Sequence, residues 1–213
     1  GLLPDEAVEN GFAGASLGLE FSGVVTKVGA QVRHLQPGDS VMGFGSACFA
    51  SHVITQADAV ALLPAGWSFE AAATVPTVFL TVYYALKQLA DLQSGERVLI
   101  HGAAGGVGIA AIQLAKHLGA EVFATAGSAE KRSFVQLLGA DHVFDSRSLQ
   151  FADDILELTS RQGVDVVLNS LIGPAQRAGM ASGMDASARL ITLALNIAAM
   201  GGVLVVGIAS ALP

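Results

Sequence analysis

The strongest constraint on the fold of this chain is a glycine-rich turn between a short apolar run and a helix-like run. Residues 98–101 predict a buried strand, and residues 107–118 predict a helix that ends at Gly119. The turn between them places Ala103, Gly105 and Gly108 at the three glycine positions of the dinucleotide-binding fingerprint, with alanine at the first. A strand, a glycine turn and a helix in this order predict a phosphate-binding loop, with a purely structural turn as the alternative.

Each part of this turn has a physical role in holding a pyrophosphate. Gly105 lets the backbone approach the pyrophosphate, Gly108 lets the helix pack closely on the strand, and the helix N-terminus offers unpaired N–H groups to an anion. We therefore predict that the cofactor contacts of this turn are Ala104, Gly105, Gly106, Val107 and Gly108.

Strand-like and helix-like segments alternate along the chain beyond residue 68. Further strands are predicted at residues 121–125, 142–144, 164–168 and 203–207, and helices at residues 69–73, 75–92, 128–138, 151–159 and, for the most part, 176–200. Strands joined by helical crossovers form a parallel sheet with helices on both faces. The prediction is a doubly wound α/β unit, which stops at its fifth strand where such a sheet usually has six.

The first third of the chain is instead β-rich. Strands are predicted at residues 19–28, 41–44 and 49–55, separated by glycines and by a turn at residues 37–39. Ser68 is the predicted helix N-cap, and a second unit begins near it. We expect a β-rich unit over residues 1–74 and the α/β unit over residues 75–213, both cut short, so that the chain is an excised and incomplete domain.

Composition and charge exclude several classes of protein. Hydrophobic residues make up 52% of the chain and charged residues 14%, which excludes disorder, and a net charge of -7 would repel a nucleic-acid backbone. The single cysteine, Cys48, excludes an intramolecular disulfide framework and fits a reducing, cytoplasmic setting. Residues 190–213 carry no charge, but Gly201 and Gly202 divide them, so we expect buried core and no membrane span.

The segment that follows the second strand of the α/β unit bears on the choice of dinucleotide. NAD sites usually carry an acidic residue at that strand end, roughly 20 residues beyond the glycines, to bind the ribose hydroxyls. Here the strand end has no acid, and Ser128, Lys131 and Arg132 follow it. These three residues could bind a 2′-phosphate through charge-assisted hydrogen bonds, so NADPH is the predicted cofactor. The alternative is that Lys131 and Arg132 form a solvated helix face.

Several segments, taken with the glycine turn, form a pattern that is specific to one family: residues 18–25, 37–43, 64–70, 75–86, 127–132 and 163–171. These residues resemble the medium-chain dehydrogenase/reductase superfamily, and more closely the enoyl reductase domains of modular polyketide synthases and animal-type fatty acid synthases. The resemblance runs from about residue 18 to residue 171 and fades beyond it.

The resemblance implies a Rossmann domain preceded by part of a GroES-like barrel. It also implies NADPH-dependent reduction of a trans-2-enoyl thioester on an acyl carrier protein, with hydride addition at the β-carbon and protonation at the α-carbon. The implied partners are that carrier protein and the neighbouring synthase domains, and the oligomeric state is left open, a homodimer included. By motif match, Thr81 and Asn169 line the nicotinamide region; helix packing and the satisfaction of a strand end are the respective alternatives.

The family's metal ligands and catalytic acids do not carry over to this chain. Leu19 replaces the metal-binding histidine of the zinc alcohol dehydrogenases, so no metal site is expected. The catalytic residues are unknown, and water or a group outside the chain is expected to supply the proton. Tyr83, Tyr84 and Lys87 lie at helical spacing and are interpreted as packing residues.

Two other functions stay open. Residues 127–131 also resemble a segment of free-standing NADPH quinone oxidoreductases. A degenerate NADPH-binding scaffold without turnover is the second alternative, because Ile208 occupies the position of a family lysine.

Overall fold

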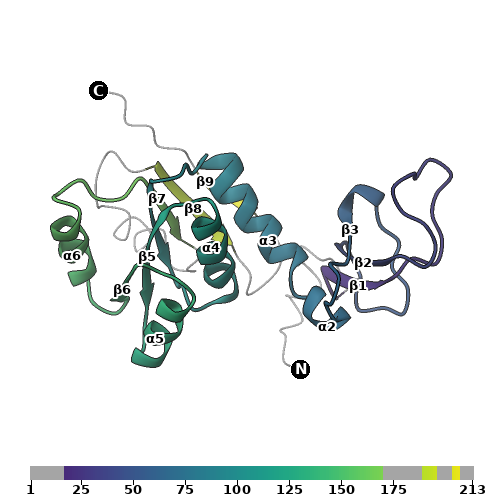
Figure 1. Ribbon diagram of the computed structural model, residues 1–213, viewed down its shortest axis with the longest axis horizontal. Coiled ribbons are helices and arrows are strands. Elements are labelled where there is room, and N and C mark those ends of the chain that lie inside the picture. Colours follow the sequence, from purple (N-terminus) through teal and green to yellow (C-terminus); the bar gives the residue numbers. More distant parts are fainter. Residues whose placement is uncertain (1–16, 170–188, 196–202, 207–213) are drawn as a thin grey trace. The chain divides into compact units, whose positions relative to one another are not determined.

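The computed structural model describes residues 17–169, 189–195 and 203–206. The chain forms two compact units, which divide between Leu80 and Thr81. This division falls inside helix α3 (Pro76–Tyr83), six residues beyond the boundary expected at residue 74. Figure 1 shows the β-rich unit and the α/β unit, which are described separately below.

The first unit contains a small antiparallel sheet. Its strands are β1 (Glu20–Val24), β2 (Ser40–Phe44) and β3 (Val60–Leu62), in the order β1-β2-β3. Gly43 lies opposite Phe21, and a Cβ atom on Gly43 would come within 2.5 Å of the Ala59 carbonyl oxygen, so the short 3₁₀-helix η1 (Ala57–Ala59) packs directly on the sheet. The strand predicted at residues 41–44 is confirmed, and the long one predicted at residues 19–28 is confined to residues 20–24.

The strand predicted at residues 49–55 is wrong, because that segment is an irregular loop. Two of its apolar side chains, Phe49 and Ile54, are 81% and 99% exposed and therefore gain no burial from strand pairing. The Phe49 N–H bonds to the Leu17 carbonyl, before β1. The third strand is β3, whose residues pair with β2 in the register Val41↔Leu62.

The helices predicted after Ser68 are present. The Ser68 hydroxyl accepts the Ala71 N–H at the start of α2 (Phe69–Ala72), which is the expected N-cap. Helix α3 continues into a π-helical segment, η2 (Tyr84–Leu89). Within the part of the chain that the structure describes, residues 69–89 are the one helical run long and apolar enough to cross a membrane by length and composition, a test that core helices of soluble proteins also pass.

The second unit is built on a six-stranded sheet of order β6-β5-β4-β7-β8-β9. The strands β4 (Arg97–His101), β5 (Glu121–Ala126), β6 (His142–Asp145), β7 (Val166–Asn169) and β8 (Arg189–Leu195) are parallel, and β9 (Val203–Val206) is antiparallel to β8. The doubly wound α/β architecture is therefore confirmed, with β4 at the point where the strand order reverses.

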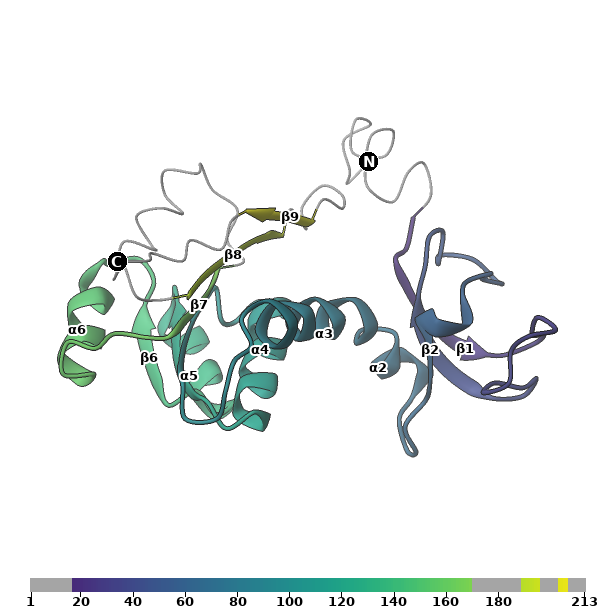
Figure 2. The same cartoon turned by 90° about the horizontal axis from the view of Figure 1, so that it is seen from above.

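Helices cover both faces of this sheet, as Figure 2 shows: α6 (Gln150–Leu158) lies on one face, and α4 (Gly106–His117) and α5 (Ala129–Leu137) lie on the other. Alternation along the strands explains the arrangement, because Leu99, Phe123 and Val167 point to one face and pack against Phe151 and Ile155 of α6. Their strand neighbours are also buried, as expected for a sheet covered on both faces.

The prediction of helix for most of residues 176–200 is wrong for residues 189–195, which form β8. The apolar run there is compatible with either a buried helix or a buried strand. It forms a strand because it pairs in register with β7, with Val166 opposite Arg189. This strand brings the sheet to six strands rather than the five that were expected. The rest of that predicted helix lies outside the described residues.

Candidate functional site

The glycine turn lies at the carboxyl end of β4 and opens helix α4. Gly105 is the N-cap of α4, with extended backbone and no side chain to accept a hydrogen bond from the first turn. The first-turn N–H groups of Gly106, Val107 and Gly108 therefore have no intrahelical acceptor. Gly105 and Gly106 are exposed, whereas Val107 and Gly108 are buried, so the open side of the turn is its backbone from Ala104 to Gly106.

The space around the glycines fits a phosphate cradle. A Cβ atom on Gly106 would meet nothing within 4 Å, and one on Gly105 would meet only the Gly102 carbonyl oxygen, at 3.3 Å. A Cβ atom on Gly108 would come within 2.5 Å of the Ala103 backbone, so glycine is required there for the helix to pack on the turn. The residues present thus fit a dinucleotide, with unpaired N–H groups on the open side and close packing beneath.

Two hydrogen bonds hold the turn in place. The Ala103 N–H donates to the Thr125 carbonyl of β5 (3.0 Å), and the Gly105 N–H donates to the Gly102 carbonyl (2.9 Å). Gly102 adopts φ 62°, which favours glycine and completes the tight bend after β4. The turn is therefore fixed to the neighbouring strand rather than held by its own loop alone.

A buried polar pair lies beneath the turn. His101 Nδ1 is 3.0 Å from Thr125 Oγ1, and both residues are almost fully buried. The imidazole also meets the ring of Phe151 edge-on, with centroids 5.5 Å apart. His101 is therefore held as a buried structural residue. Its link to Thr125 joins the ends of β4 and β5, the two strands that carry the turn.

The residues predicted to choose the dinucleotide lie at the end of β5. Ser128 is the N-cap of α5, and its hydroxyl accepts the Lys131 N–H (3.3 Å). The Glu130 backbone N–H and the Ser128 hydroxyl also donate hydrogen bonds to the Glu130 carboxylate. Both bonds lower the pKa of that carboxyl group, and the backbone bond has the larger effect. Lys131 is exposed. Arg132 instead pairs with Asp145 (3.3 Å) and donates to the Ala126 carbonyl (3.4 Å).

The structure adds a residue that the sequence patterns missed. Arg147 follows β6, and its Nε atom would lie 3.4 Å from a Cβ atom on Gly127, the residue before Ser128. The side chain therefore lies against the turn at the end of β5, and it comes from the segment that follows a third strand of the same sheet, β6. The sequence carried a signal for this residue. Arg147 comes just after the third predicted strand of the α/β unit, and the carboxyl ends of neighbouring parallel strands meet at one edge of the sheet.

The two nicotinamide candidates occupy different places. Asn169 ends β7 and pairs in register with His101, so it lies on the same sheet edge as the glycine turn and is 5% exposed. Thr81 lies half-buried on helix α3, outside the strands that form this edge. Of the predicted residues, those of the turn, Asn169 and the Ser128 segment are thus brought to one edge of the sheet.

Three further residues were interpreted as packing residues, and this interpretation is wrong for Tyr83 and Tyr84. Tyr83 and Tyr84 are 48% and 46% exposed, and Lys87 forms an ion pair with Asp91 one turn later, 3.5 Å away. Within the π-helical segment, the buried residues are instead Ala85 and Leu86.

Leu19, which stands where the zinc branch has its histidine ligand, is followed by a glutamate with a structural role. The carboxylate of Glu20 accepts the Thr77 N–H at the start of α3 (2.9 Å). Negative charge at a helix N-terminus is stabilising, so Glu20 serves as a cap supplied from β1. Within the described residues, no group of three or more potential metal ligands is found.

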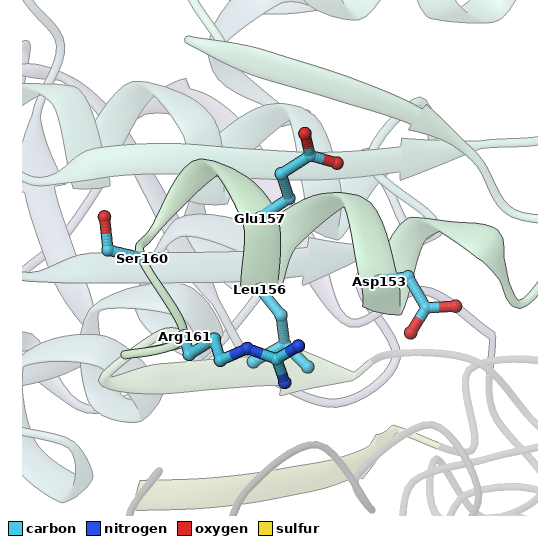
Figure 3. A pocket seen from close by; sticks show the side chains of 5 residues that line it. All are labelled: Asp153, Leu156, Glu157, Ser160 and Arg161. Carbon is cyan, nitrogen blue, oxygen red and sulfur yellow. The ribbon is translucent and has the colours of Figure 1, made fainter.

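A surface hollow lies elsewhere, on helix α6 and the turn that follows it. Asp153, Leu156 and Glu157 line it from the helix, and Ser160 and Arg161 line it from the turn (Figure 3). None of the predicted site residues takes part in it. The dinucleotide-binding features described above lie instead at the ends of β4, β5, β6 and β7.

The chain matches two families, which together span most of its length. Residues 5–81 match the family described as "Alcohol dehydrogenase GroES-like domain", and residues 106–211 match "Zinc-binding dehydrogenase". A highly reducing polyketide synthase of Didymella fabae is 48% identical over 163 residues, which cover 76% of this chain and 9% of the synthase. The chain therefore spans less than a tenth of this curated relative.

Solved structures agree with this placement. The CurK enoyl reductase is 45% identical, with a TM-score of 0.75 over 82% of this chain and 52% of the CurK chain. The quinone oxidoreductase of Escherichia coli in complex with NADPH is 39% identical, with a TM-score of 0.66 over 76% of this chain and 50% of that one. The chain thus spans about half of each solved relative, and the expected combination of a GroES-like and a Rossmann-like unit is confirmed.

Proposed function

Because the chain belongs to the medium-chain dehydrogenase/reductase superfamily and resembles the enoyl reductases of polyketide synthases, we propose that it is the enoyl-reducing part of such a synthase. The proposed reaction is NADPH-dependent reduction of a trans-2-enoyl thioester carried on an acyl carrier protein. The observation that carries this proposal is the open, capless start of α4 beside β4, in a chain 45% identical to an enoyl reductase.

The proposed cofactor is NADPH rather than NADH. In support, the first-turn N–H groups of α4 suit the pyrophosphate, and Ser128, Lys131 and Arg147 lie around the end of β5, where the adenosine ribose of a doubly wound site is bound. Lys131 and Arg147 supply positive charge and Ser128 a hydroxyl, which suits a 2′-phosphate. Arg132 forms an ion pair with Asp145, so we assign it a smaller part in binding the 2′-phosphate.

The chemistry supplied by the bound nicotinamide is hydride transfer to the β-carbon, after which the α-carbon of the substrate takes up a proton. The proposed role of this chain's residues is to bind the cofactor and to orient its nicotinamide. The glycine turn fixes the pyrophosphate end, and Asn169, at the end of β7, and Thr81, on α3, are proposed to line the nicotinamide region. Holding two reactants in one geometry is itself a large part of such catalysis.

The catalytic acid is not among the residues that we assign. We propose that water or a group outside this chain delivers the proton, and that the reaction needs no zinc, since Leu19 stands where the zinc branch has its histidine ligand. The proposed partners are the acyl carrier protein and the neighbouring synthase domains, in a cytoplasmic setting.

A free-standing NADPH quinone oxidoreductase is the second candidate, because the 39% identical structure from Escherichia coli is a quinone oxidoreductase complexed with NADPH. A degenerate NADPH-binding scaffold is the third.

One experiment separates these functions. The 213-residue chain is first titrated with NADPH and NADH, followed by nucleotide fluorescence, and then supplied with NADPH and either a crotonyl thioester or a quinone. We expect tighter binding of NADPH and its consumption with the thioester. Consumption with quinone alone would favour the second candidate, and binding without consumption the third. Equal affinity for the two nucleotides would contradict the cofactor assignment.

A further inference from the structure

Asp145, the last residue of β6, uses its two carboxylate oxygens for two different tasks. Its Oδ1 atom accepts the Arg147 N–H (2.9 Å), and its Oδ2 atom lies 3.3 Å from the Arg132 guanidinium. Asp145 also pairs in register with Ala126, the last residue of β5. It therefore stands where three segments of the candidate site meet.

The first task fixes the place of Arg147. A side chain that accepts the N–H two residues later closes a tight Asx turn. The next backbone group is also anchored, because the Ser146 N–H donates to the Ala126 carbonyl (3.2 Å) and extends the β5–β6 pairing by one bond. Held in this way, the Arg147 side chain lies against Gly127, which has no side chain to obstruct it.

The second task restrains Arg132. Its guanidinium bridges the Ala126 carbonyl and the Asp145 carboxylate, so α5 and β6 are tied together beside the same turn. The ion pair also offsets the charge of Arg132. Arg147 is therefore the arginine whose side chain lies against Gly127, and among the described residues no aspartate offsets its charge in the way that Asp145 offsets Arg132.

We propose that Asp145 is a positioning residue that sets the preference for NADPH over NADH by holding Arg147 beside the Gly127–Ser128 turn. This inference rests on the proposed function. Its expected effect on NADPH affinity is opposite in sign to the effect of the Asp145 charge alone. A carboxylate near a phosphate is repulsive, so its removal should strengthen NADPH binding if charge alone mattered, and should weaken it if the carboxylate acts through Arg147.

The test uses the full chain and binding alone. NADPH and NADH are titrated, together with 2′,5′-ADP and 5′-AMP, which differ only by the 2′-phosphate. Asp145→Ala should weaken NADPH and 2′,5′-ADP about tenfold, the scale of one charge-assisted hydrogen bond. NADH and 5′-AMP should change less than about twofold, because neither carries the 2′-phosphate. Asp154→Ala, which removes the same charge from α6, is the matched control and should change none of the four.

Two further variants separate positioning from a general structural role. Asp145→Asn keeps an oxygen that can accept the Arg147 N–H and should restore NADPH affinity to within about threefold of the parent chain. Arg147→Ala should weaken NADPH about tenfold, and adding Asp145→Ala to it should cost little more, because the two residues act as one unit.

The outcomes distinguish failure of this inference from failure of the proposed function. If the parent chain binds NADPH and NADH equally, the proposed cofactor is wrong. If the parent prefers NADPH but Asp145→Ala strengthens NADPH binding, leaves it unchanged or weakens NADH equally, the positioning role is wrong. Additive losses in the double variant would also overturn it.

Discussion

Gly108 approaches Ala103 so closely that a Cβ atom on Gly108 would lie 2.5 Å from the Ala103 carbonyl oxygen. Two residues earlier, Gly106 has no heavy atom within 4 Å of the same notional position. The two glycines therefore have different structural roles. Gly108 allows the first turn of α4 to pack on the loop, and Gly106 leaves room on the open side.

We predict that Gly108→Ala lowers the free energy of unfolding, because the new methyl group must displace backbone; overpacking of this kind typically costs about 1–3 kcal/mol. Gly106→Ala should fold normally, since its methyl group enters open space, yet should weaken NADPH binding by obstructing the phosphate. Urea unfolding and NADPH titration of both variants test this. Equal stability losses would contradict the division of roles, as would normal NADPH affinity in Gly106→Ala.

Lys131 should contribute to affinity for NADPH and not to affinity for NADH. Its side chain is exposed at the start of α5, where the Ser128 N-cap fixes the backbone. We predict that Lys131→Ala weakens NADPH about tenfold, with NADH unchanged, and that the difference shrinks as salt screens the charge. Lys27→Ala, in the other unit, is the control with the same change of charge. Equal weakening of both nucleotides by Lys131→Ala would place the lysine outside the 2′-phosphate site.

The parts of the site that lie close together in sequence were predictable. The apolar strand, the glycine turn and the capped helix at Ser128 each have a local signal, and β4, α4, β5 and α5 follow the predicted ranges within one or two residues. Arg147 was missed because its place depends on β6 pairing with β5 in register, which no local pattern specifies.

The errors have the same origin. Phe49 and Ile54 suggested a strand by their apolar character, but they are left exposed in a loop, and the third strand is formed by residues 60–62. Residues 189–195 suit a helix by local hydropathy and become β8 beside β7. In both segments, pairing between distant parts of the chain outweighed local preference.

The hydroxyl of Thr125 should stabilise the fold through His101. Thr125→Val keeps the shape of the side chain and removes the partner of His101 Nδ1 in a buried site, which typically costs about 1–3 kcal/mol. Thr77→Val is the matched control, because the Thr77 hydroxyl is buried and has no hydrogen-bond partner among the described residues. It should be neutral or stabilising. Urea unfolding measures both, and a similar loss in the two variants would contradict the role of the His101–Thr125 pair.

Asp141 should make stability depend on pH. Its carboxylate accepts the Val122 N–H (2.7 Å) and lies 2.8 Å from the Lys116 ammonium, which ties β5 and α4 together. Burial by itself raises the pKa of Asp141, but the Lys116 and Val122 bonds outweigh burial, and the net pKa lies below the ordinary value. A group whose pKa is lower in the folded state stabilises fully above its unfolded pKa, about 3.9, and loses that contribution as the pH falls through its folded pKa.

We therefore predict that Asp141→Asn, which keeps an acceptor but loses the charge, is less stable than the parent chain at pH 7. The expected difference is about 0.5–1 kcal/mol, because the carboxylate is 36% exposed and solvent screens the pair. The difference should shrink below about pH 4, where the parent aspartate takes up a proton. Urea unfolding across this range tests the prediction, with Asp153→Asn, at an exposed aspartate of α6, as the control. A gap that stays constant from pH 7 to below the folded pKa would mean that the charge of Asp141 contributes nothing to the fold.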